Sequence, residues 1–246
     1  MVDCEKRENK QVVFIIHGVV NLCLAAVVCL TFFMCGFFSS DKVMSVSKSY
    51  NGIIYAGNEN SNKVALMINV YWGTEYLLDM LDILDKYNAK ATFFVGGTWV
   101  NDEPELCLEI IKRGHEIGNH GTNHKEHGKI NYEISYTEIK NCHDAVFRLT
   151  GISMNLFAPP GGSYNSSTVK SAKDLNYQTI LWTHDTIDWR DKNEELIFQR
   201  ATSEINSGDL ILMHPTEATK NALERIILFI NGKKLALDTV SNTIKD

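Results

Sequence analysis

Patterns of buried strands and amphipathic helices alternate through the last three-quarters of the chain, and this alternation restricts the fold more than any other feature. Lys63–Val70 and Ala91–Val95 are short apolar runs typical of buried strands, and apolar residues recur at helical spacing between them. The later predicted elements, in chain order, are a helix at Asp102–Arg113, a strand at Glu116–Asn119, helices at Tyr132–Leu149 and Ser167–Leu175, a strand at Tyr177–Trp182, a helix at Glu194–Asn206, a strand at Asp209–Met213, a helix at Ala218–Ile230 and a strand near Leu235–Val240. About six or seven βα units predict an α/β fold with a mostly parallel sheet, either open and doubly wound or closed into a barrel.

A second feature lies near the N-terminus, where Val12–Phe38 contains no charged residue. As a helix rising 1.5 Å per residue, this segment is long enough to cross a hydrocarbon core of about 30 Å. A cleaved signal peptide is the alternative, but the run exceeds the usual core of about 7–15 residues and no small-x-small cleavage site follows it. We therefore expect one transmembrane signal anchor at 12–38.

The anchor prediction sets the expected organisation of the whole chain. Residues 1–11 should form a cytoplasmic N-terminus, because three cations precede the apolar segment and two follow it. Residues 39–62 are rich in Ser, Asn and Gly and should form a linker. Residues 63–246 should form the folded domain. This organisation predicts a single-pass protein of the cell membrane whose domain lies on the extracytoplasmic side.

Composition speaks against nucleic acid as a partner and leaves open whether the predicted domain contains a disulfide. The net charge of −6 speaks against a nucleic-acid surface, which usually concentrates Lys and Arg. Cys107 and Cys142 could form a disulfide in the predicted domain. Each of them fits a helix face, however, so we expect two buried free thiols instead.

Polar clusters follow several of the predicted strands directly. They are Asn69–Gly73, His120–His124, Ala158–Ser163, Asp185–Trp189 and His214. Because the carboxyl ends of parallel strands meet at one edge of a sheet, these clusters predict a functional site at that edge. The spacing of His120 and His124 lets two imidazoles reach one cation. Such a pair alone is more often structural, and its position after a strand favours the metal-ligand interpretation.

Six segments, in order, resemble the polysaccharide deacetylases of chitin, chitooligosaccharides and peptidoglycan. They read VALMINVYWG, ATFFVGG, GHEIGNHGTNH, FAPPGG, DTIDW and LILMH. The run WGTEY after the first strand resembles the branch of spore-forming Gram-positive bacteria, which suggests a link to sporulation. The resemblance implies a distorted (β/α)7 barrel, here preceded by the N-terminal transmembrane helix. It also implies metal-assisted hydrolysis of N-acetyl groups on peptidoglycan or a chitin-like glycan.

The resemblance also implies roles for individual residues. His120 and His124 would bind a divalent metal, with zinc expected. His214 would be the general acid, oriented by Asp188, whose carboxylate favours a protonated imidazole. The backbone N–H of Gly161 would stabilise an oxyanion. Three further residues would contact the substrate: Trp189, Leu212 and Pro160.

Three positions depart from the family's pattern. Asn69 and Val70 replace two aspartates, the first a base and the second a metal ligand, and Ala158 replaces an arginine that braces the base. Asn69 cannot take a proton from water and Val70 cannot bind a metal. Losing a general base costs about 10²–10⁴ in rate, and catalytic zinc usually has three protein ligands, so metal binding should be weak or lost. Asp185, or the amide oxygen of Asn69, could complete the ligand set.

These observations leave three functions open. The preferred one is a deacetylase with a rearranged site and reduced activity. The second is a catalytically inactive protein of the cell envelope that binds glycan or acts as a scaffold. The third is a membrane-tethered domain that serves only as a platform for partners.

Overall fold

The computed structural model describes residues 49–245 of the chain. No helix in this part of the chain is both long enough and apolar enough to cross a membrane. The predicted anchor at 12–38 lies outside the described residues. Residues 49–54, which we placed in a linker, contribute two short strands instead, β1 (Ser49–Tyr50) and β2 (Ile53–Ile54). The two isoleucines of β2 are buried, and β2 pairs with β7, so this segment is part of the sheet.

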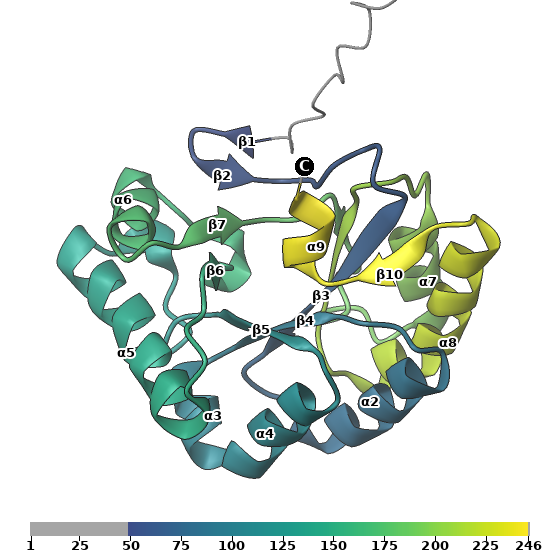
Figure 1. The fold of residues 1–246 in the computed structure, drawn as a ribbon, viewed down its shortest axis with the longest axis horizontal. Helices are drawn as coiled ribbons and strands as arrows, with labels where there is room; N and C mark the ends of the chain where they lie inside the picture. The colour runs from purple at the N-terminus through teal and green to yellow at the C-terminus, as the bar shows by residue number, and fades with distance from the viewer. Residues whose placement is uncertain (1–48, 246) are drawn as a thin grey trace, which may run out of the picture. The chain divides into compact units, whose positions relative to one another are not determined.

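The described residues form a curled, mostly parallel sheet with helices on its outer side (Figure 1). Its parallel strands are β2, β3 (Lys63–Val70), β4 (Thr92–Val95), β5 (Glu116–Asn119), β6 (Leu156–Phe157), β7 (Gln178–Ile180), β8 (His184–Asp185), β9 (Leu210–Met213) and β10 (Ala236–Asp238). The strand order is β1-β2-β7-β6-β5-β4-β3-β9-β8, with β10 beside the start of β3. The predicted parallel sheet is confirmed. β7 pairs with β2, whereas β8, which follows β7 in the chain, pairs with β9 at the other end of the strand order.

The helices connect these strands in the expected alternation. They are α2 (Leu77–Lys86), α3 (Gly97–Asp102), α4 (Pro104–Lys112), α5 (Tyr132–Thr150), α6 (Ser166–Asp174), α7 (Glu194–Thr202), α8 (Glu217–Gly232) and α9 (Val240–Ile244). One predicted helix, Asp102–Arg113, is shortened at both ends to α4, and Asp102 belongs to α3 instead. Pro104 starts α4 at its first position, and Glu103 before it has φ −127° and ψ 52° because a residue preceding proline avoids the helical region.

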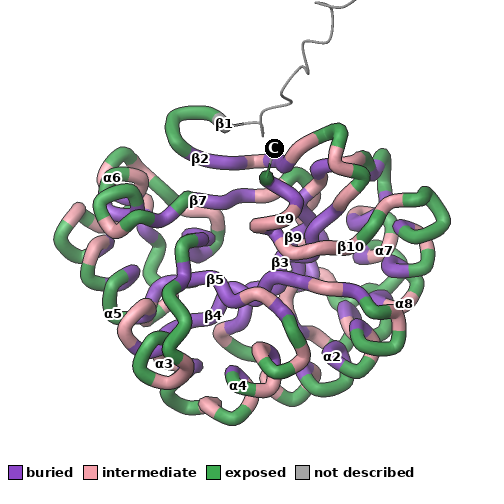
Figure 2. The backbone as a smooth tube through the Cα atoms, viewed as in Figure 1, coloured by how far each residue is buried: buried purple, intermediate pink, exposed green. Residues whose placement is uncertain are grey.

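Buried residues concentrate on the strands of the sheet (Figure 2). They form two clusters, which follow the alternation of side chains along the strands. On β3, Leu66, Ile68 and Val70 pack between the sheet and the outer helices, whereas Ala65 and Met67 face the inside of the curl. By the same alternation, Asn69 belongs to the inner face. The outer layer also holds two buried free thiols, as expected, at Cys107 and Cys142.

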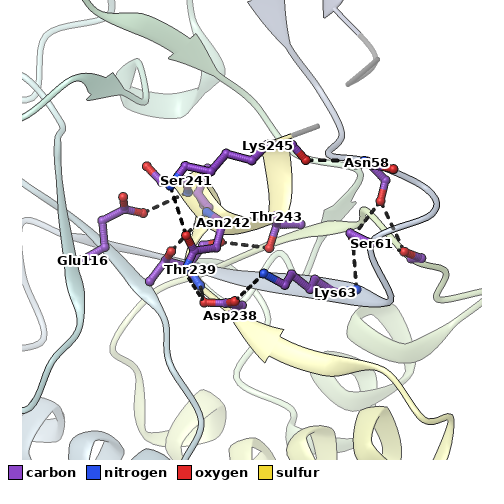
Figure 3. A network of polar contacts seen from close by, with 12 residues as sticks. Asn58, Ser61, Lys63, Glu116, Asp238, Thr239, Ser241, Asn242, Thr243 and Lys245 are labelled. Carbon is purple, nitrogen blue, oxygen red and sulfur yellow. Dashed lines mark hydrogen bonds and ion pairs between the residues drawn. The ribbon is translucent and has the colours of Figure 1, made fainter. Parts of the chain in front are cut away.

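The C-terminal helix α9 closes the amino-terminal end of the sheet through polar contacts (Figure 3). Asp238 forms an ion pair of 2.9 Å with Lys63 at the start of β3 and accepts a 2.8 Å hydrogen bond from Asn242. Glu116, at the start of β5, accepts a hydrogen bond from the backbone N–H of Ser241. Because this end of the sheet is covered, a site is expected at the carboxyl end.

A histidine–aspartate pair at the amino ends of β8 and β9 should make stability depend on pH. His184 Nε2 lies 3.1 Å from Asp209 Oδ2, and this hydrogen bond raises the pKa of His184. The stabilisation is therefore full below the ordinary imidazole pKa of about 6.5 and is lost as pH rises through the raised value. We expect wild type to exceed His184→Gln by about 1 kcal/mol in unfolding free energy near pH 5.5, and by much less near pH 9. Urea unfolding at both pH values measures this.

The stabilisation from the His184–Asp209 pair should also decrease at acid pH. Burial alone would raise the pKa of Asp209, but hydrogen bonds from His184 and the Asn206 backbone hold it below its usual value. The difference in unfolding free energy between wild type and His184→Gln should therefore also decrease as pH falls through this lowered carboxylate pKa. A difference between wild type and His184→Gln that does not vary with pH would contradict the assignment.

Candidate functional site

A cavity of about 620 Å³ opens at the carboxyl end of the sheet. Its lining residues come from the ends of separate strands: Asn69, Trp72, His124, Gly161, Trp182, Asp185, Trp189, Leu212 and His214. Six of these are predicted site positions, and a Cβ placed on Gly161 would meet no atom within 4 Å. The remaining predicted residues, which are His120, Asp188, Pro160, Val70 and Ala158, lie outside its lining. The fold therefore gathers the predicted clusters at one place.

The best-defined contact of the site joins His214 to Asp188. Asp188 is 1% exposed, and its Oδ1 lies 2.7 Å from His214 Nδ1. Its Oδ2 accepts 2.6 Å hydrogen bonds from the backbone N–H of His214 and from the hydroxyl of Thr219. The other ring nitrogen of His214, Nε2, has no hydrogen-bond partner within residues 49–245. This arrangement can hold a proton at a ring that borders the cavity.

Thr219 is a member of this cluster that sequence reasoning missed. It lies in the first turn of α8, where the side chain of Thr216 caps the helix by accepting from the Thr219 backbone N–H at 3.0 Å. Threonines three residues apart at a helix start signal such a cap. That signal does not reveal that the second hydroxyl reaches a strand-end carboxylate.

Two exposed tryptophans are among the residues that line the cavity. Trp72 is 41% exposed and lies parallel to the His214 ring, with centroids 5.4 Å apart and planes 8° from parallel. Trp189 is 55% exposed. Both also line a second cavity of about 810 Å³, which extends along the first turns of α7 and α8. The two cavities thus share an aromatic border.

The histidine pair lies beside the cavity and is held in a defined protonation state. His120 is 1% exposed, and its Nδ1 lies 2.7 Å from the carbonyl oxygen of Ala158. Because a carbonyl only accepts, Nδ1 carries the proton and Nε2 keeps its lone pair. The rings of His120 and His124 are 5.1 Å apart. Burial lowers the pKa of His124 and places that of His120 well below its usual value, so both rings are neutral at pH 7.

Glu138 of α5 holds the loop that carries the histidines. Its buried carboxylate accepts hydrogen bonds from the backbone N–H groups of Thr122 at 3.0 Å and Asn123 at 2.7 Å, and from the Asn123 side chain at 2.8 Å. These contacts fix a loop in which His124 adopts a left-handed conformation, with φ 53°. Sequence reasoning missed this residue. Its only signal is a glutamate on the apolar face of a helix, three residues after the buried Ser135.

The positions that depart from the family's pattern are all buried. Asn69 is 3% exposed, and its Oδ1 is buried without a hydrogen-bond partner in residues 49–245. Val70 belongs to the apolar layer under the helices, and Ala158 to the inner one. Neither one can supply a metal ligand or a charge to the site.

A divalent metal finds two ligands of the kind it needs in this site. The neutral His120 and His124 provide lone pairs suited to zinc. No three His, Cys, Asp or Glu side chains in the described part of the chain are grouped to hold a metal, so Asp185 does not complete the pair. Asp185 Oδ1 instead accepts a 2.8 Å hydrogen bond from the Ile187 N–H. The residues present therefore do not fit a three-ligand catalytic metal site.

Comparison with known proteins confirms the resemblance. The sequence profile of the family described as polysaccharide deacetylase matches residues 56–180. The uncharacterized protein YlxY of Bacillus subtilis is 39% identical over 193 residues, which are 78% of this chain and 60% of YlxY, so the chain spans less than two-thirds of that relative. A peptidoglycan-N-acetylglucosamine deacetylase of Bacillus cereus is 34% identical over 176 residues, covering 69% of this chain and 82% of that enzyme.

Solved structures show the same fold. A CE4 family pseudoenzyme from Bacillus anthracis superposes with a TM-score of 0.76 at 34% identity, over 78% of this chain and 69% of that chain. A mutant of it, described as a pseudoenzyme with restored enzymatic activity, gives a TM-score of 0.76 at 32% identity, over 78% of this chain and 71% of that one. The curled parallel α/β domain thus matches the CE4 fold, and the chain belongs to the polysaccharide deacetylase family.

Proposed function

We propose that this domain binds an N-acetylated cell-wall glycan in its cavity without hydrolysing it. One observation carries the proposal: the cavity is formed, while Asn69 and Val70 stand where the family has its base and its third metal ligand. A carboxamide does not ionise, so it cannot take the proton from an attacking water. Val70 is turned into the apolar layer under the helices. The likeness to a CE4 family pseudoenzyme supports this function.

Aromatic surfaces and space support a glycan as the ligand. Trp72 and Trp189 offer exposed faces on which the apolar face of a sugar ring can pack. The cavity of about 620 Å³ and its neighbour of about 810 Å³ share these two residues, so consecutive sugar units could occupy both. By likeness to the peptidoglycan deacetylases, we expect the glycan to be peptidoglycan or a chitin-like chain.

A second candidate is a deacetylase of reduced activity, and the intact His214–Asp188 pair favours it. Such an enzyme would need another proton acceptor. Asp185 is the lining carboxylate of the cavity, although one of its oxygens is already bound by the Ile187 N–H. Loss of the usual base lowers the expected rate by about 10²–10⁴.

The proposal also includes a location. The uncharged segment 12–38 would anchor the chain in the cell membrane and hold the domain toward the wall, where its glycan lies. A role in sporulation is part of the same proposal, by the resemblance of WGTEY to the spore-former branch. Carbonate extraction of membranes containing the full chain tests the anchor, because an integral protein stays in the pellet.

The full chain, purified in mild detergent, should bind an N-acetylglucosamine tetramer in calorimetry and release no acetate from it. Trp189→Ala should weaken binding about tenfold, because a stacking surface is lost. Phe147→Ala removes a similarly exposed aromatic residue from the outer helix α5 and should leave the affinity unchanged.

The same assay separates the two candidate functions. Repeated turnovers of acetate release by wild type, abolished in His214→Ala, would establish the reduced deacetylase. The absence of both binding and acetate release would exclude the glycan as ligand altogether.

A further inference from the structure

The carboxamide of Asn69 is a buried polar group that the chain itself leaves unpaired. It sits near the carboxyl end of β3 and lines the cavity of about 620 Å³. The residue is 3% exposed, and its Oδ1 has no hydrogen-bond partner in residues 49–245. Buried side-chain polar atoms are paired in the large majority of cases, so an exception at a cavity wall points to a partner supplied from outside.

The surroundings of this carboxamide limit what that partner can be. Leu212, Trp182 and Trp189 give the same cavity a largely apolar wall. Its one lining carboxylate, Asp185, is partly engaged by the backbone N–H of Ile187. A cation entering the cavity would lose its hydration and meet one lining carboxylate, Asp185, of which one oxygen already accepts a hydrogen bond.

An acetamido group matches the carboxamide, and a free amino group does not. The acetamido group carries one N–H donor and one C=O acceptor, so it can donate to the amide oxygen of Asn69 or accept from its NH₂. A glucosamine amino group in its ammonium form has three donors, no acceptor and a full charge. An uncharged amide therefore favours the acetylated sugar, whereas an aspartate here would favour the amine.

We propose that Asn69 selects the intact acetamido group over the free amine, so that the cavity distinguishes acetylated from deacetylated glycan. The inference rests on the proposed glycan-binding function and deepens it. Replacing the usual aspartate thus has a consequence beyond loss of a base: it changes which state of the sugar the cavity retains. The protein would bind the substrate of its active relatives and release their product.

Calorimetry on the full chain tests this with two probes, the N-acetylglucosamine tetramer and the glucosamine tetramer, in buffer with EDTA to remove metal. Wild type should bind the acetylated tetramer at least about tenfold more tightly, the value of one well-placed hydrogen bond and one avoided charge burial. Asn69→Asp keeps the size of the side chain and adds a charge. It should reduce this ratio at least about tenfold, chiefly by strengthening glucosamine binding.

Two further variants keep the test decisive. Asn231→Asp makes the same change at an exposed position near the C-terminal end of α8 and should leave the ratio at its wild-type value. If Asn69→Asp fails to fold by circular dichroism, Asn69→Ser removes the carboxamide without adding charge. It should weaken binding of the acetylated tetramer while leaving glucosamine binding unchanged.

The outcomes separate this inference from the proposed function. Equal wild-type affinity for the two tetramers, or an unchanged ratio in the folded Asn69 variants, would overturn the selectivity while glycan binding stands. Failure of wild type to bind either tetramer would overturn the glycan-binding function and the selectivity together.

Discussion

Combining Asn69→Asp, Val70→Asp and Ala158→Arg should produce acetate release from an N-acetylglucosamine tetramer at about 10²–10⁴ times the background measured with wild type. The first change returns a proton acceptor to the cavity wall. The second returns a carboxylate to the position where the family has its second aspartate, and the third supplies a cation that offsets the added negative charge. Acetate release measured with and without added zinc checks the prediction.

The structure shows why all three changes are needed together. Val70 and Ala158 are completely buried in apolar layers, so an isolated aspartate or arginine there would be an unpaired buried charge. We therefore expect the single variants to be destabilised and the triple variant to recover part of that loss.

His214→Ala in the triple-variant background is the matched control for this prediction. It should remove the gain, because no proton donor would remain for the leaving amine. A triple variant that folds, binds one metal ion per chain and still releases no acetate would show that the cavity does not support deacetylation.

Glu138→Ala should lower the free energy of unfolding by about 3 kcal/mol, since two backbone N–H groups and one side-chain amide of the histidine loop would lose their acceptor. Glu138→Gln keeps one acceptor oxygen and should cost about 1 kcal/mol. Glu133→Ala, at an exposed position on the same helix, should change stability by about 0.5 kcal/mol at most. Urea unfolding of the four proteins measures these differences.

The pH dependence of this effect has a defined sign. Burial alone would raise the pKa of Glu138, but hydrogen bonds from Asn123 and the charge of Lys125 hold it below its usual value. The stabilisation is present above the ordinary glutamate pKa of about 4.3 and is lost as pH falls through the lowered value. The gap between wild type and Glu138→Gln should therefore narrow in acid. A gap that widened instead would show that the carboxyl is protonated in the native loop.

Much of the fold was predictable from the sequence because the spacing of apolar residues along a strand or helix reflects which of its faces is buried. The apolar run of β3 and the glycine that ends α5 marked their elements correctly. The break before α4 was also encoded, at Pro104, although we predicted a continuous helix there. The prediction of a linker was wrong around β2. The segment is polar and contains glycine, but its two isoleucines form a strand that pairs with β7.

For the site, the sequence by itself determined which side chains of the family's pattern are present and which are missing. His120, His124, Asp188 and His214 were identified from their motifs, and the absence of an acid at position 69 needs no structure to state. These residues follow strands directly, so the shared edge of a parallel sheet brings them close together.

Only the tertiary structure decided how those residues are supported. Thr219 and Glu138 lie on helices that pack against the strand ends, and their contacts reach residues 31 and 15 or 16 positions away. The stacking of Trp72 on His214 likewise spans two strand ends. The burial of Asn69 without a partner depends on the cavity wall around it. Local periodicity carries no information on such contacts, because they are set by how the packed elements meet rather than by the residues adjacent in the chain.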